Sequence, residues 1–416
     1  MLSLDLVPTL AVAGVVLAAG HRLKRAVPVL ARANIPAPVV GGMLVALAVT
    51  AARALVDEPV RFDTTLQAPL MIAFFTSIGF GASVALLRRG GPAMLLLLAL
   101  ATAGGVVQNL VGGGVAALLG QSPLLGVLAG SLTLTGGPAT GLAFAPLFEE
   151  AGLRGAATLA TAAAMAGIVS SGLLGNPLGT WLIERRGLRP GAEPAAGARE
   201  APAERPAPDP AADPGADDTG PIVVFGRGAG IGPALVRALM VLLVAMWAGS
   251  WLSTAIEATG VTLPAYVGAM IVAAALRNLD ETTGWLGLDP ALLEELGHVA
   301  LSFFLALALM TLRLWELRGL ALPLLVILLV QVAIMVPMCL GPVFRAMGRD
   351  YESAVATSGF CGFMLGITAN AMANMDALVE RYGPAPRAFL VVPIVGAFFI
   401  DFTNALVLTV FLNLWG

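Results

Sequence analysis

Charged residues are scarce in this chain of 416 residues, in which Asp, Glu, Lys and Arg make up 12% of the sequence, against about 25% in a soluble domain. Lys24 is the only lysine, so no basic tail points to a nucleic-acid partner. Cys339 and Cys361 lie in apolar stretches and form neither a disulfide framework nor a zinc-binding cluster. The sequence also lacks H-E-x-x-H, a paired Asp motif and a Cys/His pair placed for nucleophilic chemistry, which argues against an enzyme.

Hydrophobic residues make up 58% of the chain, and its mean hydropathy is +0.89. Nearly every window of about 20 residues outside one central segment is apolar enough to cross a bilayer, which predicts an all-α polytopic membrane protein. The first apolar run, residues 1–20, is followed and not preceded by basic residues, so we expect a retained span. Further spans are expected at Ile35–Leu55, Leu66–Leu87, Ala93–Leu119, Ala156–Ile183, Gly232–Ile256, Leu263–Leu276, Val299–Leu312, Leu320–Val343 and Ala388–Leu412.

The positions of the basic residues predict how these spans, about ten in all, are oriented. With the N-terminus outside the cell, most arginines fall in cytoplasmic loops, and only Arg53, Arg61, Arg154, Arg313 and Arg318 remain outside. We therefore expect both termini on the periplasmic side and the central segment, residues 186–221, in the cytoplasm. That segment is rich in Pro, Ala, Gly and charge, which is typical of a disordered linker.

The linker separates two halves, residues 1–185 and 222–416, whose sequences are alike. The stretch "IPAPVVGGMLVA" from Ile35 matches "LPAYVGAMIVA" from Leu263, and a Phe-Phe pair followed by an Arg-Gly turn occurs in each half. Each half holds an odd number of spans, so the second copy enters the membrane in the opposite direction. An inverted repeat of this kind is typical of secondary transporters.

Each half also contains an apolar segment interrupted by small and polar residues, at about residues 122–150 and 353–381. We interpret both as re-entrant hairpins, because non-helical backbone at membrane depth needs surrounding protein or water. In the first, Gly136 and Gly137 permit a sharp turn, and Pro138 suits the start of a new helix whose N-terminus attracts a carboxylate. In the second, we expect Thr368 to cap the following helix. The alternative is a glycine-rich helix packed closely against its neighbours.

The last span carries Asp401, with Asn404 on the same face one helical turn later. A carboxylate inside a span is costly and marks a functional site, although a structural ion pair or interhelical hydrogen bond is an alternative. The corresponding place in the first half has Asn176 and no acid. His21 and His298 lie near span ends, and we interpret them as interfacial polar residues.

The chain resembles the bacterial sodium/glutamate symporter family. The resemblance is carried by "AGSLTLTGGPATG", "FFLALALMTLRLWEL", "CGFMLGITANAMANM" and "FLVVPIVGAFFIDFTNALV", and it covers nearly the whole chain outside the linker. Pro138 and Ala139 stand where the family pattern has histidine and glycine, and "TAN" from Thr368 stands where it has "TPT". The resemblance implies uptake of glutamate with Na⁺, a homodimer in the bacterial inner membrane, two five-span repeats with re-entrant segments, and an elevator motion.

With this resemblance, the interrupted segments become the expected substrate site. The candidate substrate-binding residues are Thr133, Thr135, Gly136, Gly137, Thr140, Gly366, Thr368, Asn370, Asn374 and Asp376. Na⁺ prefers oxygen ligands, and the candidate ion ligands are Asp401, Asn404, Asn176 and Ser77. We expect Asp401 to balance the ion and Asp376 to meet the substrate amino group, and the exchanged roles stay open. A sodium/proton antiporter and a symporter of another small carboxylate are the alternative functions.

Overall fold

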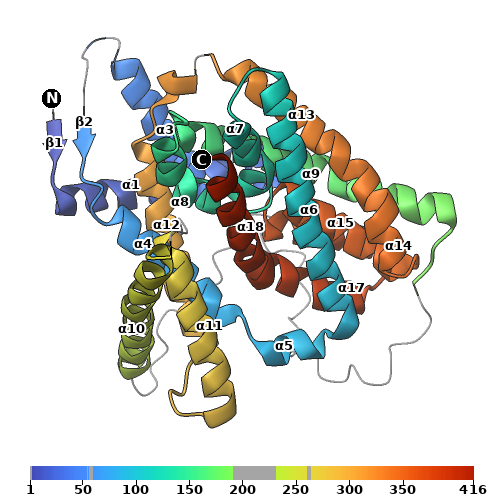
Figure 1. Ribbon diagram of the computed structural model, residues 1–416. Helices are drawn as coiled ribbons and strands as arrows, with labels where there is room; N and C mark the ends of the chain where they lie inside the picture. The colour runs from blue at the N-terminus through green and yellow to red at the C-terminus, as the bar shows by residue number, and fades with distance from the viewer. Residues whose placement is uncertain (1, 54, 56–59, 191–230, 260–263, 318) are drawn as a thin grey trace.

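The computed structural model describes residues 2–53, 55, 60–190, 231–259, 264–317 and 319–416, and most of these are helical (Figure 1). The expected linker, 186–221, lies outside the described residues apart from 186–190. In the first half the helices are α1 (Leu6–Ala26), α2 (Pro28–Arg32), α3 (Ala37–Ala52), α4 (Gln67–Gly81), α5 (Val84–Arg89), α6 (Gly91–Leu118), α7 (Pro123–Val127), η1 (Leu128–Leu132), α8 (Gly137–Glu150) and α9 (Ala156–Arg186).

The second half is helical in the same manner. Its helices are α10 (Ile231–Glu257), α11 (Ala265–Thr283), α12 (Pro290–Met310), η2 (Leu314–Leu317), α13 (Ala321–Met338), η3 (Cys339–Val343), α14 (Phe344–Ala346), α15 (Tyr351–Leu365), α16 (Thr368–Tyr382), α17 (Pro386–Ile394), η4 (Val395–Phe399) and α18 (Ile400–Trp415). Two three-residue strands, β1 (Leu2–Leu4) and β2 (Val60–Phe62), pair in parallel with Leu2 opposite Val60, a feature that the expected all-α architecture does not include.

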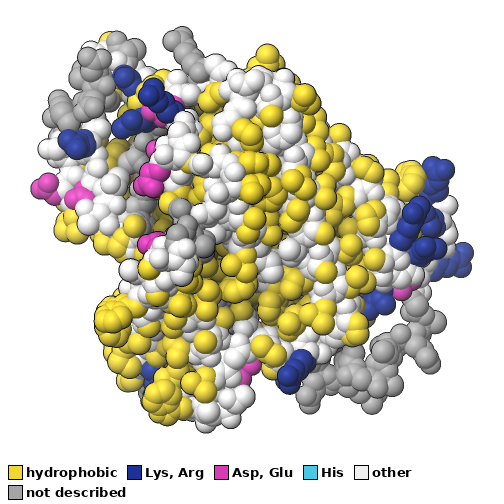
Figure 2. Space-filling view, in the orientation of Figure 1, with side chains coloured by type: hydrophobic (Ala, Val, Ile, Leu, Met, Phe, Trp, Pro, Cys, Tyr) yellow, Lys and Arg dark blue, Asp and Glu magenta, His cyan; other side chains and the backbone are white. Residues whose placement is uncertain are grey.

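Seven helical stretches in the described residues are long and apolar enough to cross a membrane, so the chain is a multi-pass membrane protein. They are Leu6–Ala26, Gly91–Leu118, Ala156–Arg186, Gly232–Glu257, Pro290–Met310, Ala321–Ala346 and Pro386–Trp415. The other three expected spans correspond to α3 and α4, which have 16 and 15 residues, and to α11, whose last turns are polar. Figure 2 shows hydrophobic side chains across the middle of the molecule and most Lys and Arg toward its edges.

The described helices pack as two groups. Helices α1, α3, α4, α10, α11 and α12 contact mainly one another, and so do α6 to α9 together with α13 and α15 to α18. In Figure 1, α10 and α11 stand side by side at the lower left, and α6, α9 and α13 lie on the opposite side. We call these the α4–α12 group and the hairpin group. Fewer contacts join them, chiefly between α8 and α12 and between α4 and η4.

Small residues hold the hairpin group together. A β-carbon on Gly126 of α7 would collide with the backbone of Gly112 in α6, so these two helices approach closely only because both positions are glycine. This contact fixes the first leg of the interrupted segment against α6, a helix of 28 residues that spans about 42 Å.

Candidate functional site

The first interrupted segment is a helix, a break and a second helix. Helix α7 continues into the π-helical turn η1, in which Gly130 has non-helical angles, φ −103° and ψ −132°. Residues 135 and 136 form the break before α8, which begins at Gly137 with φ +68°, in the left-handed region that favours glycine. Pro138 occupies the first turn of α8, where a missing N–H costs nothing.

The second interrupted segment repeats this arrangement. Helix α15 ends at Leu365, Gly366 has non-helical angles, φ −148° and ψ −122°, and α16 begins at Thr368. Thr368 does not cap α16 as the sequence suggested, because Ile367 precedes the helix and no side chain caps it. The Thr368 hydroxyl instead donates to the carbonyl of Gly396 at 2.7 Å. That carbonyl lies in η4, a π-helical turn that follows Pro393 and so leaves the α-helical hydrogen-bond pattern.

The two breaks meet inside the protein. A β-carbon on Gly137 would lie 3.0 Å from Cγ2 of Ile367. The buried side chain of Gln108 in α6 bridges them: its Nε2 donates to the Met364 carbonyl at 2.9 Å, and its Oε1 accepts from the Thr135 hydroxyl at 2.9 Å. Gln331 of α13 in turn donates to the Gln108 carbonyl at 2.7 Å. A hydrogen-bonded network therefore fixes both breaks relative to α6.

A cavity of about 930 Å³ lies between the two helix groups, at these breaks. The hairpin group contributes Thr135, Gly136, Thr368 and Asp401, and the α4–α12 group contributes Ser77 of α4 among others. The first turns of α8 and α16 line it through Pro138, Ala139, Thr368 and Ala369. Helix N-termini leave backbone N–H groups without intrahelical partners, so two positive helix ends lie at one cavity.

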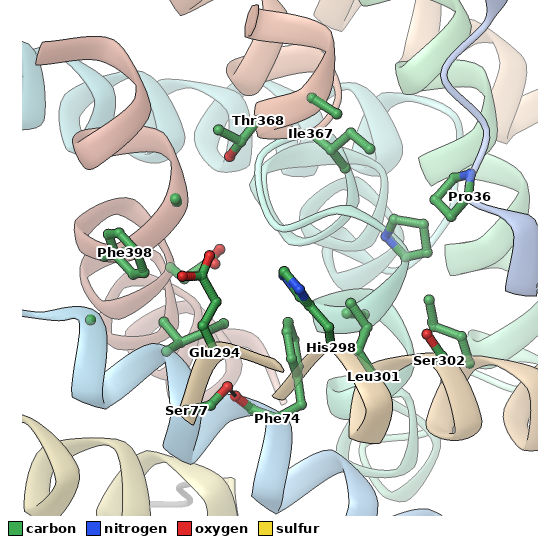
Figure 3. A pocket seen from close by; sticks show the side chains of 18 of the residues that line it. Pro36, Phe74, Ser77, Glu294, His298, Leu301, Ser302, Ile367, Thr368 and Phe398 are labelled. Atoms are coloured by element: carbon green, nitrogen blue, oxygen red, sulfur yellow. Dashed lines mark hydrogen bonds between the residues drawn. The ribbon is translucent and has the colours of Figure 1, made fainter. Parts of the chain in front are cut away.

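Helix α12 contributes titratable side chains to the cavity wall that the sequence interpretation did not assign to the site. Glu294 and His298 lie one turn apart on α12 and extend toward the cavity in Figure 3, beside Ser77 and opposite Phe398. The further charged or titratable lining residues are His21, Lys24, Arg277 and Glu295. The sequence does contain a pattern that indicates this polar face: Glu294 and His298 have the i, i+4 spacing of one helix face inside an apolar segment.

Five of the predicted site residues line the cavity, namely Ser77, Thr135, Gly136, Thr368 and Asp401. Gly137 contacts Ile367 at its edge. Thr133 and Thr140 are buried behind the cavity wall. The Thr133 hydroxyl donates to the Leu128 carbonyl at 2.6 Å. Asn370 and Asn374 donate to the Ile168 and Ser171 carbonyls of α9 at 3.1 and 3.2 Å, and Gly366 packs against Ser171.

The remaining predicted residues lie away from the cavity. Asp376 is exposed on α16 and is not among the lining residues. Asn176 of α9 accepts from the Thr180 hydroxyl at 3.2 Å and does not line the cavity. Asn404 is buried against η1, where its Nδ2 donates to the Ser131 carbonyl at 3.0 Å. The four expected ion ligands thus fall in three places, with only Ser77 and Asp401 at the cavity.

Several buried polar atoms in the hairpin group have no hydrogen-bond partner within the described residues. They are Asn109 Nδ2, Ser131 Oγ, Gln331 Oε1, Asn370 Oδ1 and Asn404 Oδ1, and Tyr266 OH of α11 is a further one. Buried polar groups are normally paired, so each such atom needs an explanation. In the part of the chain that the structure describes, no cluster of three His, Cys, Asp or Glu side chains is placed to hold a metal ion.

A family model described as sodium/glutamate symporter matches residues 2–206 and 231–384 of the chain. The sodium/glutamate symporter of Escherichia coli (strain K12) is 39% identical over 415 residues, which cover 100% of this chain and 99% of that protein. The protein of the same name from Shigella flexneri matches equally well. The sodium/glutamate symporter of Haemophilus influenzae is 38% identical over 405 residues, 97% of this chain and 96% of that protein.

Proposed function

The chain belongs to the sodium/glutamate symporter family, and on this premise we propose that it transports glutamate across the membrane together with Na⁺ by alternating access. It is a transporter and not an enzyme. The observation that carries the proposal is the pair of helix breaks, whose following helices begin at one cavity between two helix groups. Two helix N-termini that point into one cavity suit a substrate with two carboxylates.

The substrate is held at the breaks in this proposal. Its carboxylates accept hydrogen bonds from the first turns of α8 and α16, and the absence of a side chain at Gly137 lets the backbone approach them. The hydroxyls of Thr135 and Thr368 already donate to Gln108 and Gly396, so their lone pairs are left to accept from the substrate ammonium group. Asp401 supplies the full negative charge that balances Na⁺.

The transport movement is a displacement of the hairpin group past the α4–α12 group, in the elevator manner. Each half of the chain supplies three helices to the α4–α12 group, α1, α3 and α4 or α10, α11 and α12, and its interrupted segment to the other group. The backbone angles before α3 and α11 are also nearly the same, φ −59° with ψ 137° at Pro36 and 138° at Pro264. These features support two inverted repeats, residues 1–185 and 222–416, and about ten spans.

The surroundings are the bacterial inner membrane, with both termini periplasmic, the central linker cytoplasmic and two copies forming a homodimer. The arginine distribution supports the orientation, and α10 presents Val236, Leu243, Trp247 and Trp251 outward, as a lipid-facing or subunit-facing helix does.

The test is uptake of labelled glutamate by purified protein in liposomes, with Na⁺ and proton gradients imposed separately. We expect an inward Na⁺ gradient to drive glutamate uptake, and a proton gradient of equal size to leave the uptake rate unchanged. Proton-driven movement of Na⁺ without any glutamate uptake would support the sodium/proton antiporter, and glutamate uptake driven only by protons would make H⁺ the coupling ion. Uptake of another dicarboxylate in preference to glutamate would identify a different substrate.

A further inference from the structure

Two unpartnered oxygens lie close together in the hairpin group, away from the cavity surface. Ser131 Oγ of η1 and Asn404 Oδ1 of α18 are both buried: the exposed fraction of Ser131 is 0% and that of Asn404 is 2%. Neither oxygen has a hydrogen-bond partner in the described structure. Both face Gly105 of α6: a β-carbon built there would lie 3.5 Å from Asn404 Oδ1 and 3.8 Å from Ser131 Oγ. The missing side chain of Gly105 therefore leaves a space that two oxygens border.

Neighbouring hydrogen bonds fix how these oxygens are presented. Asn404 donates through Nδ2 to the Ser131 carbonyl at 3.0 Å, so its amide oxygen is turned to the other side and the amide cannot be reversed without losing this bond. The Ser131 N–H donates to Asn109 Oδ1 at 3.0 Å, which anchors the same residue to α6. Residue 131 also follows the non-helical Gly130, so η1 is distorted at this point.

We propose that Ser131 Oγ and Asn404 Oδ1 are ligands of the transported Na⁺, which binds between α6, η1 and α18 in the space beside Gly105. Hard cations take oxygen ligands from hydroxyl, amide and carbonyl groups. Asp401 lies one helical turn before Asn404 and supplies the compensating charge. This inference rests on the proposed function, and it locates the ion away from Asn176 and behind the cavity wall.

Ser131 connects the proposed ion site to the substrate site. The Ser131 carbonyl accepts from the backbone N–H groups of Thr135 and Gly136 at 3.3 and 3.1 Å, and both of these residues line the cavity. An ion that holds Ser131 in place stabilises the break on which glutamate binds. Coupling is then reciprocal: Na⁺ raises the affinity for glutamate, and glutamate raises the affinity for Na⁺ by the same factor.

The test is a Na⁺ titration of glutamate binding, by calorimetry on the purified protein, with choline chloride keeping the ionic strength constant. Ser131→Ala removes one ligand, and Gly105→Ala fills the space with a methyl group whose nearest neighbour is at an ordinary contact distance of 3.4 Å. Gly114→Ala, on the same helix in open space, is the matched control. We expect the half-maximal Na⁺ concentration to rise by about tenfold or more in the two site variants and not in the control.

A second readout needs no glutamate: Na⁺ should raise the thermal unfolding midpoint of the native protein and of Gly114→Ala, and less so that of Ser131→Ala and Gly105→Ala. Unaltered Na⁺ titrations in both site variants would overturn the site and indicate a water molecule there, while leaving the proposed function intact. If Gly105→Ala fails to fold, Ser131→Ala alone decides, because it removes only a hydroxyl. Glutamate binding by the native protein without any Na⁺ requirement would instead contradict the proposed function.

Discussion

Gly137 and Ile367 bring the two helix breaks into contact. A β-carbon on Gly137 would lie 3.0 Å from Ile367 Cγ2, although the two residues are far apart in sequence. Gly137 also has φ +68°, so a side chain there meets both a crowded neighbour and a strained backbone. The second break therefore limits the size of residue 137 in the first.

Replacing Gly137 by Ala should weaken glutamate binding, and Gly137→Val should abolish it. The left-handed conformation alone costs a non-glycine residue about 1–2 kcal/mol, and the contact with Ile367 adds to this at the substrate site. Calorimetric titration with glutamate at saturating Na⁺ measures the effect. Gly120→Ala is the control, since Gly120 has φ +71° and nothing within 4 Å. Equal losses in both variants would mean that strain and not the contact is responsible.

Replacing Gln108 by Leu should destabilise the hairpin group. The change leaves the Met364 carbonyl without its donor, and the Thr135 hydroxyl, 3.5 Å from that carbonyl, can compensate only in part. We expect a loss of about 1–3 kcal/mol in the free energy of unfolding, which is the usual cost of an unsatisfied buried group. The measurement is the thermal midpoint, compared with Gln121→Leu in the loop before α7. An unchanged midpoint would show that Gln108 does not hold the two breaks.

Replacing Asp401 by Asn should weaken the Na⁺ dependence of glutamate binding more than it changes the choice among amino-acid substrates. The carboxylate is the full negative charge that the hairpin group presents at the cavity, and the amide keeps its shape without that charge. Glutamate affinity measured against Na⁺ concentration checks this. Asp376→Asn, whose carboxylate is exposed outside the cavity, should titrate like the native protein. An unaltered titration of Asp401→Asn would remove that residue from the ion site.

Asp350, outside the membrane spans, should make stability depend on pH. Burial works to raise the pKa of Asp350, but hydrogen bonds from Ser353 and the charge of Arg387, 3.1 Å away, outweigh it and lower the pKa below 3.8. A lowered pKa stabilises the fold above the unfolded-state value, and this stabilisation disappears as the pH falls through the folded-state value.

The Asp350→Asn variant tests this dependence, because asparagine still caps α15 without the charge. At pH 7 we expect the variant to be less stable by under about 1 kcal/mol, as for other exposed ion pairs. Thermal midpoints of the two proteins should converge as the pH falls below about 4. A constant difference from pH 7 to pH 3 would assign the effect to something other than the ionisation of Asp350.

Much of the architecture was predictable from local patterns. Long apolar runs specify spans such as α6 and α9 because a helix satisfies its own backbone in lipid. The Gly-Gly-Pro at residue 136 and the glycine at 366 interrupt such runs, and breaks occur at both. Asp401 stood out because a carboxylate in an apolar span is rare, and it lies at the cavity.

Packing between distant segments decided what the local patterns could not. Glu294 and His298 line the cavity because α12 packs on α4, and the Thr368 hydroxyl reaches the Gly396 carbonyl because α16 packs against η4. Asn404 turns its oxygen toward Gly105 because the Ser131 carbonyl takes its amide hydrogens. Sequence periodicity determines which face of a helix is apolar or polar. Which polar faces share one cavity depends on contacts between residues hundreds of positions apart, and these are set only when the whole chain packs.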